Sequence, residues 1–438
     1  MTAHSASLMT AGSPRPDRLP AQFPQLLPAD GRPAGLPAHL AAHGPLPYRG
    51  SAGRLIADVR ESGLTGRGGA AFPAGRKMAA VAAAGREPVV VANGAESEPL
   101  SEKDVTLLRY SPHLVLDGLQ LAAEAVGARR AVLYLHDDGS LHGRLNEILA
   151  ERRSAGLDRT ATDLVLAPPR FLSGQETAAV NVINGGPALP GFTPPRTFER
   201  GVGGLPTLMQ NVETLAHLAL IARYGAPWFR GAGTAVEPGS MLCTVRQAGG
   251  GSAVVQAALG TPLGDLLLLS DDVQAVLVGG YHGTWLPAGQ ARRLSLSNTA
   301  LRPAGASAGA GVLAALPAGS CGLAETARVA RYLALESAGQ CGPCLNGLPR
   351  IATALGTVAW SRPDNRVTAD LGRWAGLAER RGACHHPDGA VRFVRSALQV
   401  FAAEIRCHQR GACTAAAGQP FLPVPAGPAD ESDWRAPR

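Results

Sequence analysis

The sequence predicts a three-part protein: an α/β region with a largely parallel sheet, a small α+β module and a C-terminal helical bundle. Between about residues 45 and 230, apolar runs alternate with helical patterns, which is typical of a parallel sheet covered by helices on both faces. Between about 235 and 320 the helical periodicity fades into short β-rich runs separated by Gly and Pro. From 322 to about 414, four apolar stripes recur at helical spacing, as in an antiparallel bundle.

Within the first region, residues 88–93 form an apolar run that ends in polar residues, as expected of a buried strand. A helix is predicted over residues 111–127, because a Ser-Pro pair opens the segment and a Gly closes it. Further strands are predicted at residues 131–135 and 164–167. Since parallel sheets bind ligands at the carboxyl ends of their strands, functional side chains are expected directly after these runs.

Composition sets the predicted boundaries. Residues 1–44 and 415–438 are rich in Pro and small residues without sustained periodicity, so both tails are expected to be disordered. The remaining chain divides into an α/β domain at 45–232, a small module at 233–320 and a helical domain at 321–414.

The bulk properties exclude several classes of protein. The net charge of +7 is spread over scattered Arg residues, whereas a nucleic-acid-binding protein would show a basic stripe. The chain has no apolar run of about 18 residues and no signal-peptide pattern, so a cytoplasmic protein without membrane insertion is expected. Five of the seven cysteines follow residue 340, which indicates metal or redox chemistry rather than disulfides.

The densest chemical motif is the segment 337–344, which contains Cys341 and Cys344 and is followed by Cys384. A cubane iron–sulfur cluster takes four thiolates, and this motif supplies three. An adjacent imidazole could bind the open iron as in Rieske centres, a distant cysteine could fold back, or the site could hold three irons or no cluster. In the last case the thiols would be small core side chains. The candidates for the fourth ligand are His385, His386, Cys321, Cys407 and Cys413.

Cys407-His408 and Cys413 also stand close together at the end of the last predicted helix. Their spacing does not match a standard metal motif. They are therefore a less favoured second metal site.

Four polar segments follow predicted strands or begin helices. The glycine-rich segment 63–73 lets the backbone approach an anion, with Arg67 supplying charge; it lacks the Walker ending, so nucleotide hydrolysis is not expected. Segment 93–99 places two carboxylates after a strand. Segment 173–178 offers helix-start N–H groups for a phosphate, and 210–214 is polar within an apolar helix. Taken singly, each could instead be a flexible turn, a helix cap or a contact with neighbouring backbone.

Taken together with the cysteine motif, these segments resemble the flavoprotein subunit of NADH:quinone oxidoreductase (respiratory complex I), NAD-reducing hydrogenases and formate dehydrogenases. The shared motifs are Gly-Arg-Gly-Gly-Ala-x-Phe-Pro, Asn-x-x-Glu-Ser-Glu-Pro, Gly-x-Glu-Thr-Ala, Asn-Val-Glu-Thr-Leu and Glu-Ser-x-Gly-Gln-Cys-x-Pro-Cys. The resemblance implies a Rossmann-like FMN domain, a ubiquitin-like β-grasp module of the soluble-ligand-binding type and a four-helix bundle that holds a [4Fe-4S] cluster.

The resemblance also implies site residues. Glu96 and Glu98 correspond to catalytic carboxylates, and Gly69, Phe72 and Glu98 match residues that contact NADH. Cys341, Cys344 and Cys384 correspond to cluster ligands. The implied flavin-pocket residues are Gly66, Arg67, Gly68, Lys77, Asn93, Glu96, Ser97, Gly174, Gln175, Glu176, Asn211 and Thr214.

The chain departs from the family pattern at several positions. Ala95 stands where the family usually has Asp, Gln175 where it has Glu, and Ala338 where it has the first cysteine. On the nicotinamide side two aromatic residues and a Lys are replaced. Losing a stack of about 1 kcal/mol and a charged hydrogen bond of about 1.5–3 kcal/mol would lower NADH affinity by roughly one to three orders of magnitude, so NAD(H) binding is expected to be weak. The replacing residues are Ala80, Thr193 and Arg196.

The predicted function is electron transfer from FMN to an iron–sulfur cluster that is either [4Fe-4S] or incomplete. The expected partners are other redox subunits, either ferredoxin-like or membrane-bound, in a complex to which this chain is at most peripheral. The alternative is a degenerate, non-catalytic homologue that acts as a binding or assembly module of a redox complex.

Overall fold

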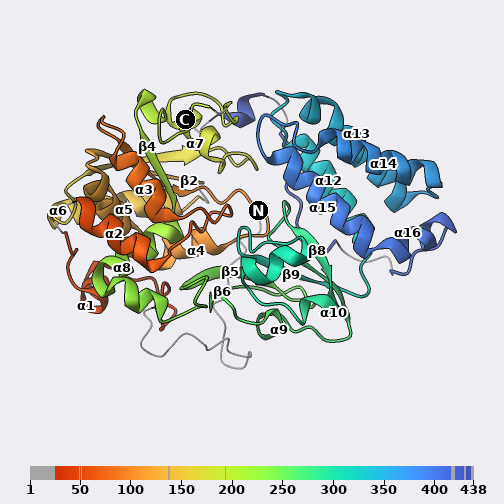
Figure 1. The fold of residues 1–438 in the computed structure, drawn as a ribbon, viewed down its shortest axis with the longest axis horizontal. Coiled ribbons are helices and arrows are strands. Elements are labelled where there is room, and N and C mark those ends of the chain that lie inside the picture. The colour runs from red at the N-terminus through yellow and green to blue at the C-terminus, as the bar shows by residue number, and fades with distance from the viewer. Residues whose placement is uncertain are drawn as a thin grey trace.

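The computed structural model describes residues 25–48, 50, 52–136, 139–192, 194–415, 420–428 and 431–435. Thr193 and the predicted tail at residues 1–24 therefore lie outside the described residues. Figure 1 shows three groups of elements in chain order: an α/β unit in red to green, a second sheet with short helices in green to teal, and a set of helices in blue. Within the described part of the chain, no helix combines the length and apolarity needed to cross a membrane.

The first sheet is parallel and Rossmann-like, as predicted. Its strands are β1 (Val89–Gly94), β2 (Arg130–His136), β3 (Ala161–Ala167) and β4 (Thr207–Asn211), in the order β3-β2-β1-β4. The expected strands at residues 88–93, 131–135 and 164–167 correspond to β1, β2 and β3.

Helices cover both faces of this sheet. Side chains alternate along β1 and β2, so Val90 and Leu133 pack into one apolar core with α2, α5 and α8, while Val91 and Tyr134 pack into another with α7. This alternation of buried faces is what the continuous apolar runs in the sequence indicate. The helices are α2 (Ala52–Ser62), α3 (Ala74–Ala82), α4 (Lys103–Tyr110), α5 (Pro112–Val126), α6 (Leu141–Ser154), α7 (Glu176–Ile183) and α8 (Val212–Arg230).

Helix α5 matches the predicted helix at 111–127 in both bounds. Pro112 is its first residue, and Gly127 ends it in the left-handed conformation with φ of 74°. Ser111 is the N-cap residue, but its side chain makes no capping hydrogen bond. Gly118 allows α5 to cross α8 closely, because a Cβ there would lie 2.0 Å from the Leu215 carbonyl oxygen.

The second sheet has five strands: β5 (Ser240–Arg246), β6 (Ser252–Ala258), β7 (Val273–Val278), β8 (Thr284–Pro287) and β9 (Val312–Pro317). Their order is β6-β5-β9-β7-β8, with β5 and β9 parallel and the other neighbours antiparallel. One face packs against the short helices α9 (Leu263–Leu266), α10 (Ala288–Ala291) and α11 (Asn298–Leu301). The other face shares an apolar core with the C-terminal helices.

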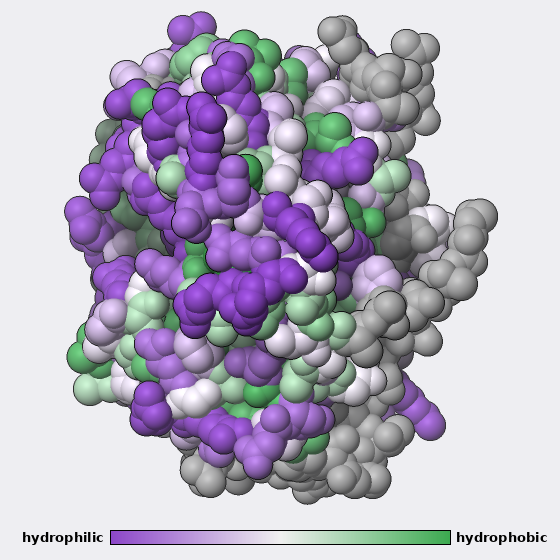
Figure 2. All heavy atoms as spheres, turned by 90° about the vertical axis from the view of Figure 1, so that its right-hand side faces the viewer, coloured by the Kyte–Doolittle hydropathy of each residue, from purple (hydrophilic) through white to green (hydrophobic). Residues whose placement is uncertain are grey.

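The C-terminal helices are α12 (Gly322–Leu335), α13 (Leu348–Trp360), α14 (Asn365–Ala378), α15 (His386–Val400) and α16 (Ala402–Gln409). Helix α12 packs on α13 and α15, and α14 packs on α13 and α15. The apolar stripe from Val391 to Ile405 is divided between α15 and α16 at Phe401. Figure 2 shows that the outward face of this region is mainly hydrophilic, with hydrophobic residues in separate small groups outside the grey atoms.

Two buried carboxylates join the three regions. Glu213, at the start of α8, accepts a hydrogen bond from the Leu242 backbone N–H of β5 at 2.8 Å and pairs with Lys103 at 2.9 Å. Glu336, directly after α12, accepts from the Phe171 N–H at 2.9 Å and from Arg170 at 3.0 Å. The first carboxylate ties the two sheets together, and the second ties the helices to the α/β unit.

The predicted disorder of residues 1–44 and 415–438 is wrong for parts of both tails. Residues Leu36–His43 form helix α1, and Leu26 is fully buried. Near the C-terminus, Phe421 and Leu422 are buried, and both backbone N–H groups donate to Glu325 of α12. These short segments lack periodicity because they are stabilised by docking on the folded chain rather than by local structure.

The described N-terminal segment is anchored by a buried charge cluster around Asp117. This carboxylate accepts from His39 at 2.8 Å, Arg152 at 2.9 Å and Arg223 at 2.5 Å, and both Asp117 and Arg152 are fully buried. Asp117 is therefore a shared partner of two buried arginines.

We expect Asp117→Ala to destabilise the protein by about 3–5 kcal/mol, because it leaves buried cations without their shared partner. Urea denaturation of the full chain would measure the change. The control is Asp163→Ala, which removes a half-exposed pair with Arg130 and should cost at most about 1 kcal/mol. Equal effects of the two substitutions would contradict the prediction.

Candidate functional site

Polar residues from four distant segments meet at the carboxyl edge of the first sheet. Asn93 near the end of β1 is paired in register with Asn211 at the end of β4. The Arg67 backbone N–H donates to the Thr214 hydroxyl at 2.9 Å, which places the glycine-rich loop over the start of α8. The Gly174 N–H donates to the Ser97 hydroxyl at 2.8 Å. The segments 63–73, 93–99, 173–178 and 210–214 therefore form one site.

The guanidinium of Arg67 does not face this edge as a free charge. Its side chain is buried, with Nε donating to the Ser240 carbonyl at 3.1 Å and Nη1 to the Thr65 hydroxyl at 2.8 Å. Burial lowers the pKa of Arg67, although nearby Glu213 acts against this. Two of its nitrogens thus hold the loop against the second sheet, and the expectation that Arg67 supplies charge to an anion now rests on Nη2, which has no partner among the described residues.

Lys77 and Glu176 form an ion pair of 3.0 Å at the same edge, and both are partly exposed. Glu176 also accepts a hydrogen bond from the Thr197 hydroxyl. Lys77 thus places a positive charge near the glycine-rich loop, and the ion pair with Glu176 holds the Lys77 side chain there.

Both implied catalytic carboxylates accept backbone hydrogen bonds. Glu96 accepts from the N–H groups of Asp104 at 3.1 Å and Val105 at 3.0 Å, at the start of α4. Burial, with Asp104 adding to it, raises the pKa of Glu96 to about 7. Glu98 accepts from the Tyr281 N–H of the second module at 2.8 Å, and burial raises its pKa to about 8. These carboxyls therefore hold protons near neutral pH.

The two family departures in this site have local structural explanations. Gln175 is the N-cap residue of α7, and its side-chain oxygen accepts from the N–H groups of Thr177 at 2.8 Å and Ala178 at 3.0 Å. An amide oxygen caps a helix as a carboxylate would. Ala95 is nearly buried and joins the apolar core under α7.

The residues present fit an FMN group. Gly69 has a φ of 106°, a conformation that other residues rarely adopt, and it leaves room beside the loop. Two buried nitrogen donors, Arg67 Nη2 and Gln210 Nε2, have no hydrogen-bond partner among the described residues. Buried donors need acceptors, which a flavin ring and phosphate would supply.

Phe72, which the family resemblance implies as an NADH contact, is not fully covered by other described residues. Phe72 is 50% exposed, and the Arg76 guanidinium lies 5.9 Å from its ring. A cavity of about 510 Å³ lies beside α7, lined in part by Asn184, Phe192 and Gln340. Sequence reasoning missed Gln340, because it belongs to the cysteine segment and its place in this cavity depends on the packing of two domains.

Cys341, Cys344 and Cys384 lie together beyond the C-terminal end of α12. Cys344 stands in a π-helical turn, Pro343–Gly347, and Cys384 precedes α15. Burial raises the pKa of Cys344 to about 12, and the nearby Cys341 and Cys384 add to the rise. Such crowded thiols favour a cation that stabilises their thiolate forms, so the donor set fits an iron–sulfur cluster.

The structure shows the surroundings of the two histidines that are candidates for the fourth ligand of the cluster. His386 is buried, with Nε2 2.8 Å from the Leu333 carbonyl and Nδ1 3.0 Å from His282, so both ring nitrogens are engaged. His385 is fully exposed and faces Asp388 at 3.7 Å. Ala338 packs against the apolar core under α7.

Two of the distant cysteines, Cys321 and Cys413, do not fold back to this loop. Cys321 is the N-cap residue of α12, and Cys413 lies close to it. Helix α12 has 14 residues, so about 20 Å separates its two ends. Neither thiol therefore completes the Cys341, Cys344 and Cys384 set.

Comparison with known proteins gives matches over most of the chain. Residues 59–220 match the Nuo51 FMN-binding domain, and residues 324–408 match the NADH-ubiquinone oxidoreductase-F iron-sulfur binding region. The F subunit of NADH-quinone oxidoreductase from Streptomyces coelicolor is 29% identical over 390 residues, covering 84% of this chain and 85% of that protein. The corresponding protein of Rickettsia bellii (strain OSU 85-389) is 30% identical, covering 67% of this chain and 75% of that protein.

A solved structure shares the fold. The structure of an NAD+-reducing [NiFe]-hydrogenase in the air-oxidized state superimposes with a TM-score of 0.77 at 27% identity, covering 90% of this chain and 69% of that one. The motifs, the converging site and these matches agree, and the chain belongs to the family of NADH-quinone oxidoreductase F subunits.

Proposed function

We propose that this protein is an electron-transfer subunit that passes electrons from FMN to an iron–sulfur centre. The observation that carries this proposal is the meeting of four motif segments at one sheet edge, with the cysteine segment held against the same domain. Glu336 makes that second connection through Phe171 and Arg170, directly before the cysteine loop. A flavin accepts electrons in pairs and releases them singly, which suits transfer to a cluster.

In this proposal the glycine loop and the start of α8 hold the flavin. The backbone N–H groups of residues 66–69 are suited to a phosphate, while Lys77 supplies charge. Asn93, Ser97 and Gly174 fix the strand ends. The full proposed set is Gly66, Arg67, Gly68, Gly69, Phe72, Lys77, Asn93, Glu96, Ser97, Gly174, Gln175, Glu176, Asn211 and Thr214, with Glu96 and Glu98 as catalytic carboxylates and Cys341, Cys344 and Cys384 as cluster ligands.

The domain assignment is part of the proposal. The strand order β6-β5-β9-β7-β8, with parallel central strands, supports a β-grasp module, and the mutual packing of α12, α13, α14 and α15 supports a four-helix bundle. We place the domains at 45–232, 233–320 and 321–414.

The partners are proposed to be other redox subunits. The relatives are named as subunits of NADH-quinone oxidoreductase, and Leu345, next to Cys344, is 62% exposed. An exposed apolar residue beside the cluster loop supports docking of an electron acceptor there, either ferredoxin-like or membrane-bound. A cytoplasmic location, peripheral to a membrane complex, is consistent with this role.

A non-catalytic assembly role is the second candidate, favoured by Ala338, which offers no thiolate and packs against an apolar core. Anaerobic purification with flavin, iron and sulfide quantitation separates the two roles. Electron transfer predicts about one flavin and three to four irons per chain, with reduction by dithionite and only weak bleaching by NADH. Protein that retains neither group when both are supplied would overturn the redox proposal.

The loop anchor at Thr214 gives a test of flavin binding. We expect Thr214→Val to weaken FMN binding by about 3- to 10-fold, because the Arg67 N–H loses its acceptor and the loop is less fixed, a change of about 0.5–1.5 kcal/mol. Quenching of flavin fluorescence on titrating apoprotein would measure the affinity. Thr353→Val is the matched control, since Thr353 is exposed and bonds its own helix. An unchanged affinity in Thr214→Val would contradict the proposed loop position.

Restoring a cysteine at position 338 tests the proposed ligand set of the iron–sulfur cluster. We expect Ala338→Cys to raise the iron content to about four per chain, because it supplies the fourth thiolate that a cubane takes. Iron and sulfide analysis with electron paramagnetic resonance of the reduced protein would measure the change. Ser337→Cys, which adds a thiol at the preceding position, should leave the wild-type value unchanged. If the wild type holds fewer than four irons and Ala338→Cys leaves that number unchanged, residue 338 does not face the cluster and the proposed ligand set is wrong.

A further inference from the structure

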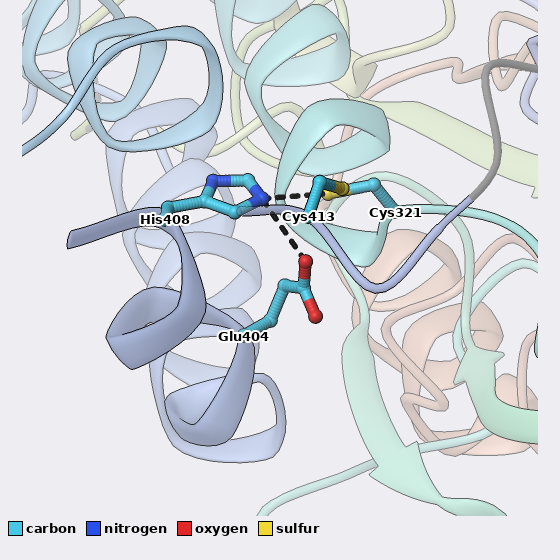
Figure 3. A group of neighbouring side chains, drawn as sticks. All are labelled: Cys321, Glu404, His408 and Cys413. Atoms are coloured by element: carbon cyan, nitrogen blue, oxygen red, sulfur yellow. Dashed lines mark hydrogen bonds and ion pairs between the residues drawn. The ribbon is translucent and has the colours of Figure 1, made fainter. Parts of the chain in front are cut away.

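A second cluster of metal-binding side chains lies apart from the flavin and cysteine sites. The ligand atoms of Cys321, Glu404, His408 and Cys413 all lie within 4.8 Å of one another. Figure 3 shows that the four side chains point toward a common centre from α12, α16 and the segment after α16. Two sulfurs, one imidazole nitrogen and one carboxylate therefore converge in a small volume.

The first ligand is positioned by the start of α12. Cys321 is its N-cap residue, and its sulfur accepts from the Ala324 N–H at 3.4 Å. The sulfur of Cys321 is thereby held at the start of the helix, and thiolate sulfur is a ligand that transition metals of the zinc class take. The sulfur lies 3.7 Å from His408 Nε2.

The imidazole and the carboxylate come from one face of α16. Glu404 and His408 are four residues apart, a spacing that places side chains next to each other on a helix, and Glu404 Oε1 lies 3.0 Å from His408 Nε2. The opposite nitrogen, Nδ1, lies 2.8 Å from the Val358 carbonyl oxygen. Because a carbonyl only accepts, Nδ1 carries the proton and Nε2 faces the other ligands.

In metal-bound histidines, the ring nitrogen that does not bind the metal usually donates to a carbonyl or carboxylate. The contact between His408 Nδ1 and the Val358 carbonyl is of this kind. His408 is only 4% exposed. Without a cation, its Nε2 would meet a carboxylate oxygen and two sulfurs in a nearly buried setting. A metal ion supplies the positive charge that this donor set lacks.

The last ligand is brought back by a turn after α16. Gly411 adopts a φ of 74°, and the Ala412 N–H donates to the Cys407 carbonyl at 3.0 Å. The Thr414 N–H then donates to Glu404 Oε1 at 2.9 Å. These contacts return Cys413 to the face that carries Glu404 and His408. Cys413 is an exposed residue, which leaves a path for a metal ion to enter.

We propose that Cys321, Glu404, His408 and Cys413 form a structural site for one divalent transition-metal ion of the zinc class. Thiolate and imidazole ligands exclude magnesium and calcium, which take oxygen ligands, and four N, S and O ligands suit tetrahedral zinc. The site is separate from the iron–sulfur loop, because the two stand at opposite ends of the 14-residue helix α12.

The bound metal would fix the end of α16 to the junction between the second sheet and α12. It closes a chain segment from residue 321 to 413, and the residues that follow dock on the same helix, where the N–H groups of Phe421 and Leu422 donate to Glu325 at 3.1 and 2.8 Å. Metal binding therefore stabilises the C-terminal segment.

The test uses full-length protein purified with a reductant and supplied with Zn²⁺ alone. Elemental analysis should find one zinc per chain. Zinc-edge X-ray absorption should find two sulfur ligands at about 2.3 Å and two lighter ligands at about 2.0–2.2 Å. The iron content is measured on the same samples, so loss of zinc is distinguishable from loss of the iron–sulfur cluster.

The variants are Cys413→Ser and His408→Ala, with Cys407→Ala as the matched control on the same helix. Zinc affinity should fall more than about 100-fold in the first two, since even the loss of an outer partner costs about 10- to 100-fold, and should be unchanged in Cys407→Ala. Because Cys413 is exposed, Cys413→Ser should still fold and should keep its iron.

Three results would overturn the proposal. Zinc retained in Cys413→Ser would remove that thiol from the ligand set. An equal loss of zinc in Cys407→Ala would show that the effect is not specific to the four residues. A Cys321–Cys413 disulfide found by mass spectrometry in zinc-free protein that cannot be loaded after reduction would assign the two thiols another role.

Discussion

The buried carboxylate of Glu213, which pairs with Lys103 in its own domain and with β5 of the second sheet, is the constraint on which the arrangement of the two sheets depends. Glu213 is fully buried, and its second oxygen accepts from the Leu242 N–H of β5. Burial alone would raise the pKa of Glu213, yet Lys103 and His217 hold it at about 2. A charge of this kind is tolerated in the interior because every oxygen has a partner. Any rotation between the sheets would break the hydrogen bond from Leu242 and leave one buried oxygen of Glu213 without a partner, so Glu213 fixes their relative position.

The same short segment also builds the flavin edge. Asn211 is the N-cap residue of α8 and donates from its amide to Asp104 at 2.7 Å. Glu213 connects to the second sheet, and Thr214 accepts from the Arg67 N–H. Three residues of one motif thus determine where α8 begins, how the two sheets are connected and where the glycine-rich loop lies. Residues that resemble ligand contacts in the sequence act here in large part by positioning the groups around the site.

Sequence patterns predicted those parts of the structure that local periodicity determines. The runs at 88–93, 131–135 and 164–167 became strands, and the helix at 111–127 has the expected ends, because apolar alternation and Pro and Gly positions act over a few residues. The hydrogen bond of the Arg67 side chain to the Ser240 carbonyl was not predictable, since the two residues are 173 positions apart. The contact between Cys321 and His408, which are 87 residues apart, was not predictable for the same reason. Long-range partners leave no local signal in one sequence.

Helix α12 connects the two proposed metal-binding regions. At its C-terminal end, Glu336 bonds to Phe171 and Arg170 of the flavin domain directly before the cysteine loop. At its N-terminal end, Cys321 faces α16 and the returning C-terminal segment. A helix held at both ends has little freedom to tilt, and electron transfer depends on a fixed separation between donor and acceptor. The position of the cysteine loop relative to the flavin edge is therefore set by contacts at both ends of one helix.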